Sequence, residues 1–456
     1  MRALLAITSA ACLLATAVAA SPAQAESLNL TQAWQAALQK DPSYQAAISE
    51  REAGQTNRAL GRAALLPQLS ASIGRNKIRG TLDSPSQFGG TVRSDLDYMA
   101  RTNEIRATQS VFDWSRIAEY RQGHARADYS LAVFDTKAKD TAVRLVNRYF
   151  QVLLSYENVV LAQSKVKADE QQITVAERRF DSGEGTITDV REARSRRDLA
   201  RADLILAEDA LLVAQRELQE MVGSSPTRLT TLRPDFKPQV LAPATLADWH
   251  AMAMGRNAEI RTGQEGLRIS DYEIDRTFGG HLPTLDLIAA RRDVSNDTLS
   301  TRNQDATTNS FGFQIALPIF SGGLTSAQVR QAKHNRERAS QELAATREQA
   351  SVEVTRQYHA VVSGAQRIDA LITAVESTAA ALKAIEMGYQ AGTRSIVDIL
   401  DAQDLLYRSR LDLTQARLQY VLARLMLSAV AGGLNAASID AVSDQYFGPD
   451  QVVLGR

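Results

Sequence analysis

The chain has 456 residues, of which 44% are hydrophobic and 23% are charged, and 52 basic residues balance 52 acidic ones. A net charge of zero without a basic block excludes a nucleic-acid-binding surface. Aromatic residues make up only 6% of the chain, and its wealth of Ala, Leu, Arg, Gln and Glu is typical of long helices.

Residues 1–25 are expected to be a signal peptide that the mature protein lacks. Arg2 gives a short basic start, an apolar run follows, and Ala23-Gln24-Ala25 fits a signal-peptidase site. Cys12 is the only cysteine and lies in a poor lipoprotein signal, so we expect neither a lipid anchor nor a disulfide. This suits a bacterial periplasm or outer membrane.

Later stretches are too short for a membrane-spanning helix. The longest late uncharged one, at 425–439, has 15 residues, whereas a spanning helix needs roughly 20 apolar residues. If the chain crosses a membrane, we expect it to do so with β-strands.

A pattern of short helices, two strands and a long helical hairpin occurs twice. "LLPQLSAS" at 65–72 matches "HLPTLDLI" at 281–288, and "FDSGEGTITDVREA" at 180–193 matches "YQAGTRSIVDILDA" at 389–402. Because the matches fall in the same order, they predict an internal duplication. The expected segments are a first structural repeat (26–223), a proline-rich connector (224–244), a second repeat (245–432) and a C-terminal tail (433–456).

Each repeat is expected to open with short helices. Thr31 is placed as the cap of the first helix and Pro42 as the start of the second, while Thr245 and Ala258 begin their equivalents. The connector contains four prolines, so we expect an extended segment without a fold of its own. The tail is expected to be poorly ordered.

Strands are predicted where apolar residues alternate. The clearest case is 310–317, where Phe311 and Phe313 are two apart, and 285–289 and 69–73 alternate in the same way. A fourth strand, at 98–111, is predicted mainly from its place in the repeat. The segments between paired strands are rich in Gly, Ser, Thr, Asn and Asp, so they are expected to be solvated loops, at 79–97 and 293–309.

Very long helices follow each strand pair. Residues 324–391 lack proline, and apolar or small residues from Val354 to Leu382 recur at an average spacing of 3.5 residues, which predicts a left-handed coiled coil. A helix of this length spans roughly 100 Å. Return helices are expected at 396–431 and, in the first repeat, at 188–222 after a helix at 115–182.

Four strands cannot close a barrel, and an open edge in lipid leaves backbone groups unpaired. Closure therefore requires more than one chain. Two chains give eight strands around a filled interior, and three give twelve around a water-filled lumen. The trimer is favoured, while the dimer stays open at this point.

The chain resembles the TolC family of outer-membrane exit ducts. The resemblance rests on "LLPQL", "GHLPTLDL", "LPIFSGG" and above all "GYQAGTRSIVDILDAQ" at 388–403. It implies an α+β, mostly α fold, in which long coiled-coil hairpins form an α-barrel and four strands per chain contribute to a trimeric 12-stranded transmembrane β-barrel. It also implies a homotrimer in the outer membrane of a Gram-negative bacterium, extending into the periplasm. Its partners there are a periplasmic adaptor (membrane fusion) protein and an inner-membrane ABC or RND transporter, with outer-membrane lipid around the strands.

The resemblance places a gate at the periplasmic end. Asp398 and Asp401 lie three apart and share a helix face, and the family analogy makes them a selectivity ring for cations. The alternatives are two solvated surface acids, or Asp398 as an acid at a helix N-terminus.

A latch is the second expected feature of the gate. Family analogy makes Tyr389 and Arg394, on the second hairpin, the partners of Thr188 and Asp189 on the first. The alternative is that Thr188 and Asp189 only cap a helix and that Arg394 is free in solvent.

Roles are also predicted for the hairpin tips and for two phenylalanines of a predicted strand. Gly183, Gly185, Gly392 and Thr393 shape the hairpin tips, where the resemblance places adaptor docking. Phe311 and Phe313 are expected to face lipid, the alternative being the core of a soluble sandwich.

The sequence contains no phosphate loop, nucleophile elbow or metal signature, so we expect no catalytic residue, cofactor or metal site. The predicted function is an exit path for type I protein secretion or multidrug efflux. The alternative is a secreted coiled-coil protein or adhesin without a pore. The sequence does not identify the cargo.

Overall fold

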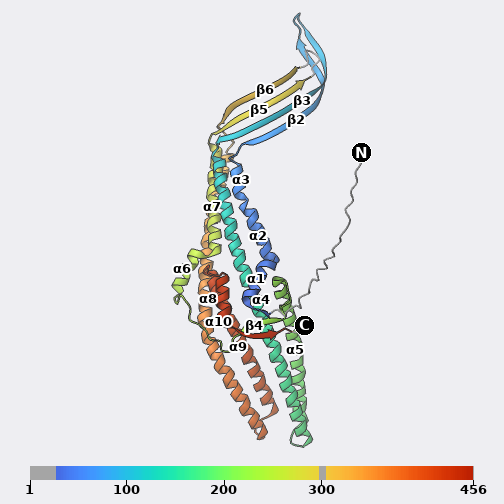
Figure 1. Ribbon diagram of the computed structural model, residues 1–456, viewed down its shortest axis with the longest axis vertical. Coiled ribbons are helices and arrows are strands. Elements are labelled where there is room, and N and C mark those ends of the chain that lie inside the picture. The colour runs from blue at the N-terminus through green and yellow to red at the C-terminus, as the bar shows by residue number, and fades with distance from the viewer. Residues whose placement is uncertain (1–26, 297–303, 455–456) are drawn as a thin grey trace, which may run out of the picture.

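The computed structural model describes residues 27–296 and 304–454, so the predicted signal peptide lies outside the described residues. The molecule is long and narrow, with a four-stranded sheet at one end and two helical hairpin tips at the other (Figure 1). A small second sheet lies at the waist, near the C-terminus.

The elements follow the predicted order in both repeats. The helices are α1 (Leu30–Lys40), α2 (Pro42–Gln55), α3 (Asn57–Ala63), α4 (Trp114–Asp181), α5 (Ile187–Val222), α6 (Leu246–Arg256), α7 (Ala258–Phe278), α8 (Leu324–Gln390), α9 (Ile396–Val430) and α10 (Ala436–Tyr446), with a 3-10 turn η1 (Gly279–His281). The strands are β1 (Ser27–Leu28), β2 (Gln68–Pro85), β3 (Thr91–Phe112), β4 (Arg228–Leu232), β5 (Thr284–Asn296), β6 (Gln304–Ala316) and β7 (Phe447–Val453).

The cap of α1 differs from the prediction. Asn29, not Thr31, caps this helix, because the Asn29 side chain accepts a hydrogen bond from the Gln32 backbone N–H at 2.7 Å. Pro42 does begin α2, where its missing N–H costs nothing.

The four-stranded sheet has the order β2-β3-β5-β6 with antiparallel neighbours. Its strands are longer than predicted: β2 and β3 pair from Gln68↔Thr108 as far as Pro85↔Thr91. The expected loop at 79–97 is therefore wrong, and only 86–90 turn, with Gly89 and Gly90 at φ +86° and +94°. Of the other expected loop, 293–296 and 304–309 are strand, and 297–303 lie outside the described residues.

The long hairpins form as predicted. α4 has 68 residues and α8 has 67, a length of roughly 100 Å each. Along α8 the predicted seam residues Val354, Val361 and Ile368 are buried, and the remaining seam residues are partly buried. This burial of every seventh residue is the packing expected of a coiled coil.

The waist holds the main apolar core around a three-stranded sheet of order β1-β4-β7. Tyr149 is buried there, and its hydroxyl donates to the carbonyl oxygen of Thr230 at 2.8 Å and lies 3.1 Å from that of Leu28. Two expectations are wrong at this point. The connector contributes β4, and the tail folds as α10 and β7, with Tyr446 and Phe447 packed in the core.

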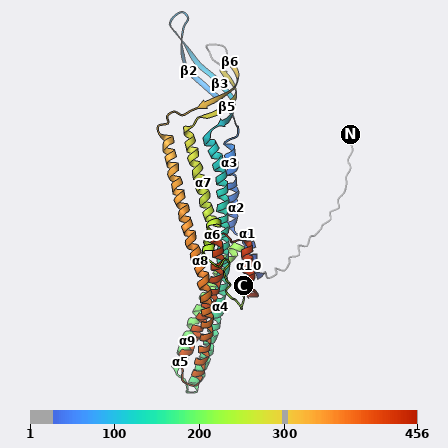
Figure 2. The same ribbon diagram turned by 90° about the vertical axis from the view of Figure 1, so that its left-hand side faces the viewer.

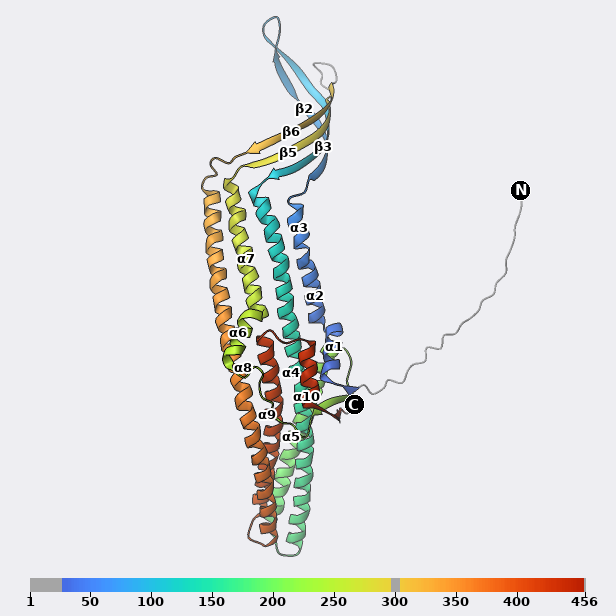
Figure 3. The ribbon, with the colours of Figure 1, turned by 60° about the vertical axis from the view of Figure 1, so that its left-hand side comes forward.

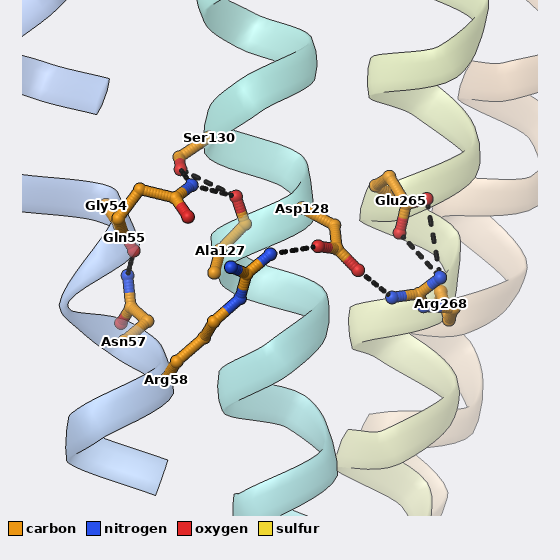
Figure 4. Close-up of polar contacts among 9 residues, drawn as sticks. All are labelled: Gly54, Gln55, Asn57, Arg58, Ala127, Asp128, Ser130, Glu265 and Arg268. Carbon is orange, nitrogen blue, oxygen red and sulfur yellow. Dashed lines mark hydrogen bonds and ion pairs between the residues drawn. The ribbon is translucent and has the colours of Figure 1, made fainter. Parts of the chain in front are cut away.

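A carboxylate joins the two repeats above the waist. Asp128 on α4 accepts from Arg58 of α3 at 2.9 Å and from Arg268 of α7 at 2.6 Å (Figure 4). Burial opposes ionisation of Asp128, but the two guanidinium groups outweigh it and lower the pKa of this carboxyl. The ion pairs therefore hold helices of both repeats against α4.

Neighbouring elements form a single row at each level of the molecule. Above the waist the row runs α8, α7, α4 and then α2 with α3 (Figures 2 and 3). Below the waist α8 packs on α9, α9 on α4, and α4 on α5. The sheet repeats this arrangement, with β6 and β2 at its edges. Elements of the second repeat thus end each row on one side, and elements of the first repeat end it on the other.

Candidate functional site

The two hairpin tips turn in the same way. Gly183 and Gly392 follow the ends of α4 and α8, both with φ +76°, a conformation that favours glycine. At the first tip the Gly185 N–H donates to the Arg179 carbonyl at 2.9 Å, and a Cβ on Gly185 would lie 3.0 Å from the Cβ of Arg179. At the second tip the Thr393 N–H donates to the Gly388 carbonyl at 2.9 Å. The predicted tip residues therefore do shape the turns.

Each return helix starts with a capping box. Thr186 caps α5 and exchanges hydrogen bonds with Asp189, and Ser395 caps α9 and exchanges them with Asp398. Thr188 lies inside the first turn of α5 rather than at its cap. Both boxes were readable in the sequence as Thr or Ser followed three residues later by Asp.

Asp398 therefore has a local role in the single chain. Its Oδ2 accepts from the Ser395 backbone N–H at 2.8 Å and from the Ser395 hydroxyl at 3.0 Å. The backbone hydrogen bond first, and the hydroxyl second, lower the pKa of Asp398, so it carries its charge at neutral pH.

Asp401 is paired within the chain. Its Oδ1 lies 3.0 Å from Nη2 of Arg196 on α5, and Arg196 also contacts Glu192 at 3.1 Å. The two predicted ring residues thus differ: Asp401 forms an ion pair with the first hairpin, whereas Asp398 forms none among the described residues.

The predicted latch contacts do not occur within one chain. Within the described residues, 27–296 and 304–454, no hydrogen bond joins Tyr389 or Arg394 to Thr188 or Asp189. Tyr389 is buried against Arg179 instead: the guanidinium carbon lies 4.3 Å from the ring centroid, and Nη2 donates to the Tyr389 carbonyl at 3.2 Å. Arg179 is a tip residue that the sequence analysis missed.

A second set of missed residues lies farther from the tips. Lys165 on α4 contacts Oδ1 of Asp404 on α9 at 2.5 Å, and Nζ lies 5.7 Å from the Tyr407 ring centroid. Asp169, one turn along α4, is 2% exposed, and its Oδ2 has no hydrogen-bond partner among the residues that the structure describes. The signal was present, because Asp404 continues the three-residue spacing of Asp398 and Asp401.

At the opposite end, Phe311 and Phe313 on the edge strand β6 are 81% and 71% exposed. Ile315 and Leu317 are exposed as well, so the isolated chain buries neither face of this strand. In the part of the chain that the structure describes, none of the helices has an apolar stretch sufficient to span a bilayer.

Comparisons with known proteins agree with this architecture. A family model described as outer membrane efflux protein matches residues 33–224 and 249–433. Alkaline protease secretion protein AprF of Pseudomonas aeruginosa is 32% identical over 92% of this chain and 87% of its own length. Proteases secretion protein PrtF of Dickeya chrysanthemi is 33% identical over 93% of this chain and 92% of its own length.

Solved structures share the fold. The outer membrane protein VceC of Vibrio cholerae superimposes with a TM-score of 0.75 at 17% identity, covering 89% of this chain and 96% of that one. The arrangement of a sheet on long helical hairpins is that of an outer-membrane channel. The chain belongs to the outer membrane efflux protein family, and the predicted family resemblance, fold class and outer-membrane location are confirmed.

The pH dependence of Asp169 gives a test of the contact between hairpins. Burial raises the pKa of Asp169 to about 6, partly offset by Lys165, whereas the unfolded chain has a pKa of about 3.9. Because the folded value is the higher one, the contribution of Asp169 to stability is complete below about pH 4 and is lost as the pH rises through 6. Asp169→Asn should therefore be more stable than the wild type at pH 7.5, by about 1–3 kcal/mol, and equally stable near pH 4.

Thermal unfolding of the purified protein, followed by far-UV circular dichroism at both pH values, measures this difference. Asp235→Asn is the control, because Asp235 is 76% exposed and should give no pH-dependent difference. Equal unfolding temperatures of Asp169→Asn and wild type at pH 7.5 would contradict the prediction.

Proposed function

We propose that three copies of the chain form one continuous duct, with a 12-stranded barrel in the outer membrane and a helical tunnel in the periplasm. One observation carries the proposal: among the described residues, the sheet and the helical layers away from the waist each end in an uncovered edge on both sides. The edges are β6 and α8 on one side, and β2, α2 with α3, and α5 on the other. Joining unlike edges head to tail gives a closed ring when the rotation between copies is one third of a turn. The repeats at 26–223 and 245–432 then supply alternate sectors of the wall.

The exposed face of α5 supports this packing. Leu199, Leu206 and Val213 are seven residues apart and all exposed in the single chain. A stripe at heptad spacing is the seam that a coiled coil needs, and α8 of the next copy is the element that the ring brings to it.

We propose type I secretion of a protein as the transport reaction. AprF and PrtF, two relatives above 30% identity, are both named for the secretion of proteases. The duct itself needs no catalytic group or cofactor, because an inner-membrane ABC transporter supplies the energy and a periplasmic adaptor docks at the tips around Gly183, Gly185, Gly392 and Thr393. With an RND transporter the same duct would serve multidrug efflux, and export assays with each transporter separate the two.

The assembly is tested in the outer-membrane fraction and in lipid bilayers. The protein should run on gels as a heat-sensitive trimer and should conduct ions as single channels. Phe313→Asp should sharply reduce membrane insertion, because it places a charge on the face proposed to meet lipid in each of three copies. The cost should reach about 2 kcal/mol per chain, since an acidic residue in lipid costs less than Arg or Lys.

Gln314→Asp is the matched control, because residue 314 points to the other face of β6. It should insert and conduct as the wild type does. A secreted, monomeric chain without channel activity would favour the structural alternative, a coiled-coil protein or adhesin.

We further propose that the latch forms between copies. In the closed ring α8 of one copy lies beside α5 of the next, which brings Tyr389 and Arg394 towards Thr188 and Asp189 of the neighbouring chain. The double variant Tyr389→Phe, Arg394→Ser should then raise single-channel conductance several-fold. A conductance equal to that of the wild type would reject the latch.

The selectivity ring is proposed from the same symmetry, which brings Asp398 and Asp401 of all copies towards one axis. A multivalent cation such as Gd³⁺ on the periplasmic side should block the current. Because Arg196 pairs with Asp401, Asp398→Ala should relieve the block more than Asp401→Ala. Unchanged block in a variant that lacks both carboxylates would exclude the ring.

A further inference from the structure

The pairing register of the four-stranded sheet places a row of apolar side chains across all four strands. The row consists of directly opposed residues on β2, β3, β5 and β6, which are Leu69, Ala107, Ala289 and Phe311. Residues two apart along a strand point to the same face. This face therefore carries further apolar side chains, which are Ala71, Ile73, Ile105, Leu287, Phe313 and Ile315. We call these residues together the apolar band, and they lie on the face that the proposed function directs towards lipid.

Basic side chains follow on the same face where the apolar band ends. On β2 the last apolar member is Ile73, and the next residues of this face are Arg75, Lys77 and Arg79. On β3 Arg101 lies directly opposite Arg75. All four basic side chains are exposed, and we call them the basic cluster.

The basic cluster lies towards the end of the sheet that is farther from the helices. β2 starts beside α3 and β3 ends beside α4, so Gln68 and Phe112 mark the near end of these strands (Figure 1). Within the described residues β5 pairs with β3 only as far as Ala100, so the hairpin of β2 and β3 extends beyond the rest of the sheet. With the helices in the periplasm, as proposed above, the basic cluster meets the outer boundary of the membrane.

Arg75 and Arg101 repel each other in the protein alone. Directly opposite side chains of an antiparallel pair have Cβ atoms about 4.5–5.5 Å apart, and like charges there are destabilising. Arg75 donates to the Gly74 carbonyl at 2.9 Å and to Oδ1 of Asn103 at 3.1 Å, and neither acceptor is charged. Neither arginine has an ion-pair partner among the residues that the structure describes.

The carboxylates on this part of the face are already paired. Asp97 lies 2.9 Å from Nζ of Lys77 and 3.6 Å from Nε of Arg79. Asp293 of β5 is paired with Arg291 at 3.8 Å. The four cations of the basic cluster therefore face one carboxylate, that of Asp97, which leaves an excess of three positive charges.

We propose that Arg75 and Arg101 bind a phosphate group of a lipid in the outer leaflet, with Lys77 beside them and the acyl chains against the apolar band. A phosphate accepts hydrogen bonds from two guanidinium groups at once, in the bidentate geometry that arginine favours, and its charge removes their repulsion. A lipid fits better than a free anion, because its chains cover the apolar band while its head group meets the cations. The inference rests on the proposed function, since it needs this face of the sheet to lie against lipid.

The other face of the sheet has a different arrangement of charges. Glu104 lies there directly opposite Arg292, and Arg106 follows two residues along β3 on the same face. Charges of opposite sign are thus neighbours on that face, which is the favourable arrangement. Arg106 and Arg292 therefore offer a matched control, with the same charge on the same sheet but away from the proposed lipid.

The test uses purified trimers in detergent, with lipid A and with lipid A from which the phosphates have been removed. Native mass spectrometry measures the lipid that the trimer retains, in EDTA so that no divalent cation bridges lipid phosphate to Asp97. The wild type should bind lipid A roughly tenfold more tightly than the dephosphorylated form, because a hydrogen bond to a charged group contributes about that factor. The double variant Arg75→Gln, Arg101→Gln should lose this preference.

The matched control is the double variant Arg106→Gln, Arg292→Gln, which removes the same charge from the opposite face. It should keep the wild-type preference for the phosphorylated lipid. An equal loss in both double variants would reveal a general effect of net charge and would overturn the proposal. An unchanged preference in Arg75→Gln, Arg101→Gln would overturn it as well.

Inorganic phosphate at millimolar concentration distinguishes a lipid site from a site for free anions. It should not displace lipid A from the wild type, and displacement would overturn the assignment to a lipid. If Arg75→Gln, Arg101→Gln forms no trimers, the wild type decides by itself, since equal binding of the two lipids would reject the site. A wild-type chain that forms no trimers would instead reject the proposed function.

Discussion

The unpaired backbone along β2 and β6 is the constraint on which the rest of the structure depends. A sheet edge withdrawn from water needs partners for its N–H and C=O groups, and this chain has none to offer from its own described residues. The helical layers below end in the same two directions as the sheet. The sheet at one end and the helical layers below it are therefore expected to find their partners in the same two directions.

The sequence predicted those parts of the fold whose signal is periodic. α8 begins at the predicted Leu324 and ends at Gln390, one residue before the predicted boundary. The segment lacks proline, is followed by Gly392, and has a spacing of 3.5 residues over 354–382. The outer halves of β2 and β3 were missed because they are polar and glycine-rich, and their pairing depends on a partner strand rather than on alternation. The folding of the tail into α10 and β7 was missed for a related reason, since the residues that these elements contact in the core are distant in the sequence.

The candidate site divides in the same way. The turns were predictable because Gly183 and Gly392 act through local backbone geometry. The Lys165–Asp404 contact spans 239 positions of the chain, and a local pattern reveals which face of a helix such a residue occupies but not which helix it meets. Arg196 likewise gave no local signal that it would neutralise Asp401. The turns at the tips could thus be predicted from the sequence. The contacts between charged side chains on different helices could be seen only in the folded structure.

The waist sheet has a consequence for the timing of assembly after export. Its strands come from 27–28, 228–232 and 447–453, so the first, middle and last parts of the described chain meet in one small sheet. A chain that is delivered from its N-terminus presents β7 last, and contacts of such sequence separation form slowly. The long hairpins are local and can form early, so the periplasm holds a chain whose helices are paired but whose waist is open. The waist sheet is therefore expected to be the last part of the described chain to close.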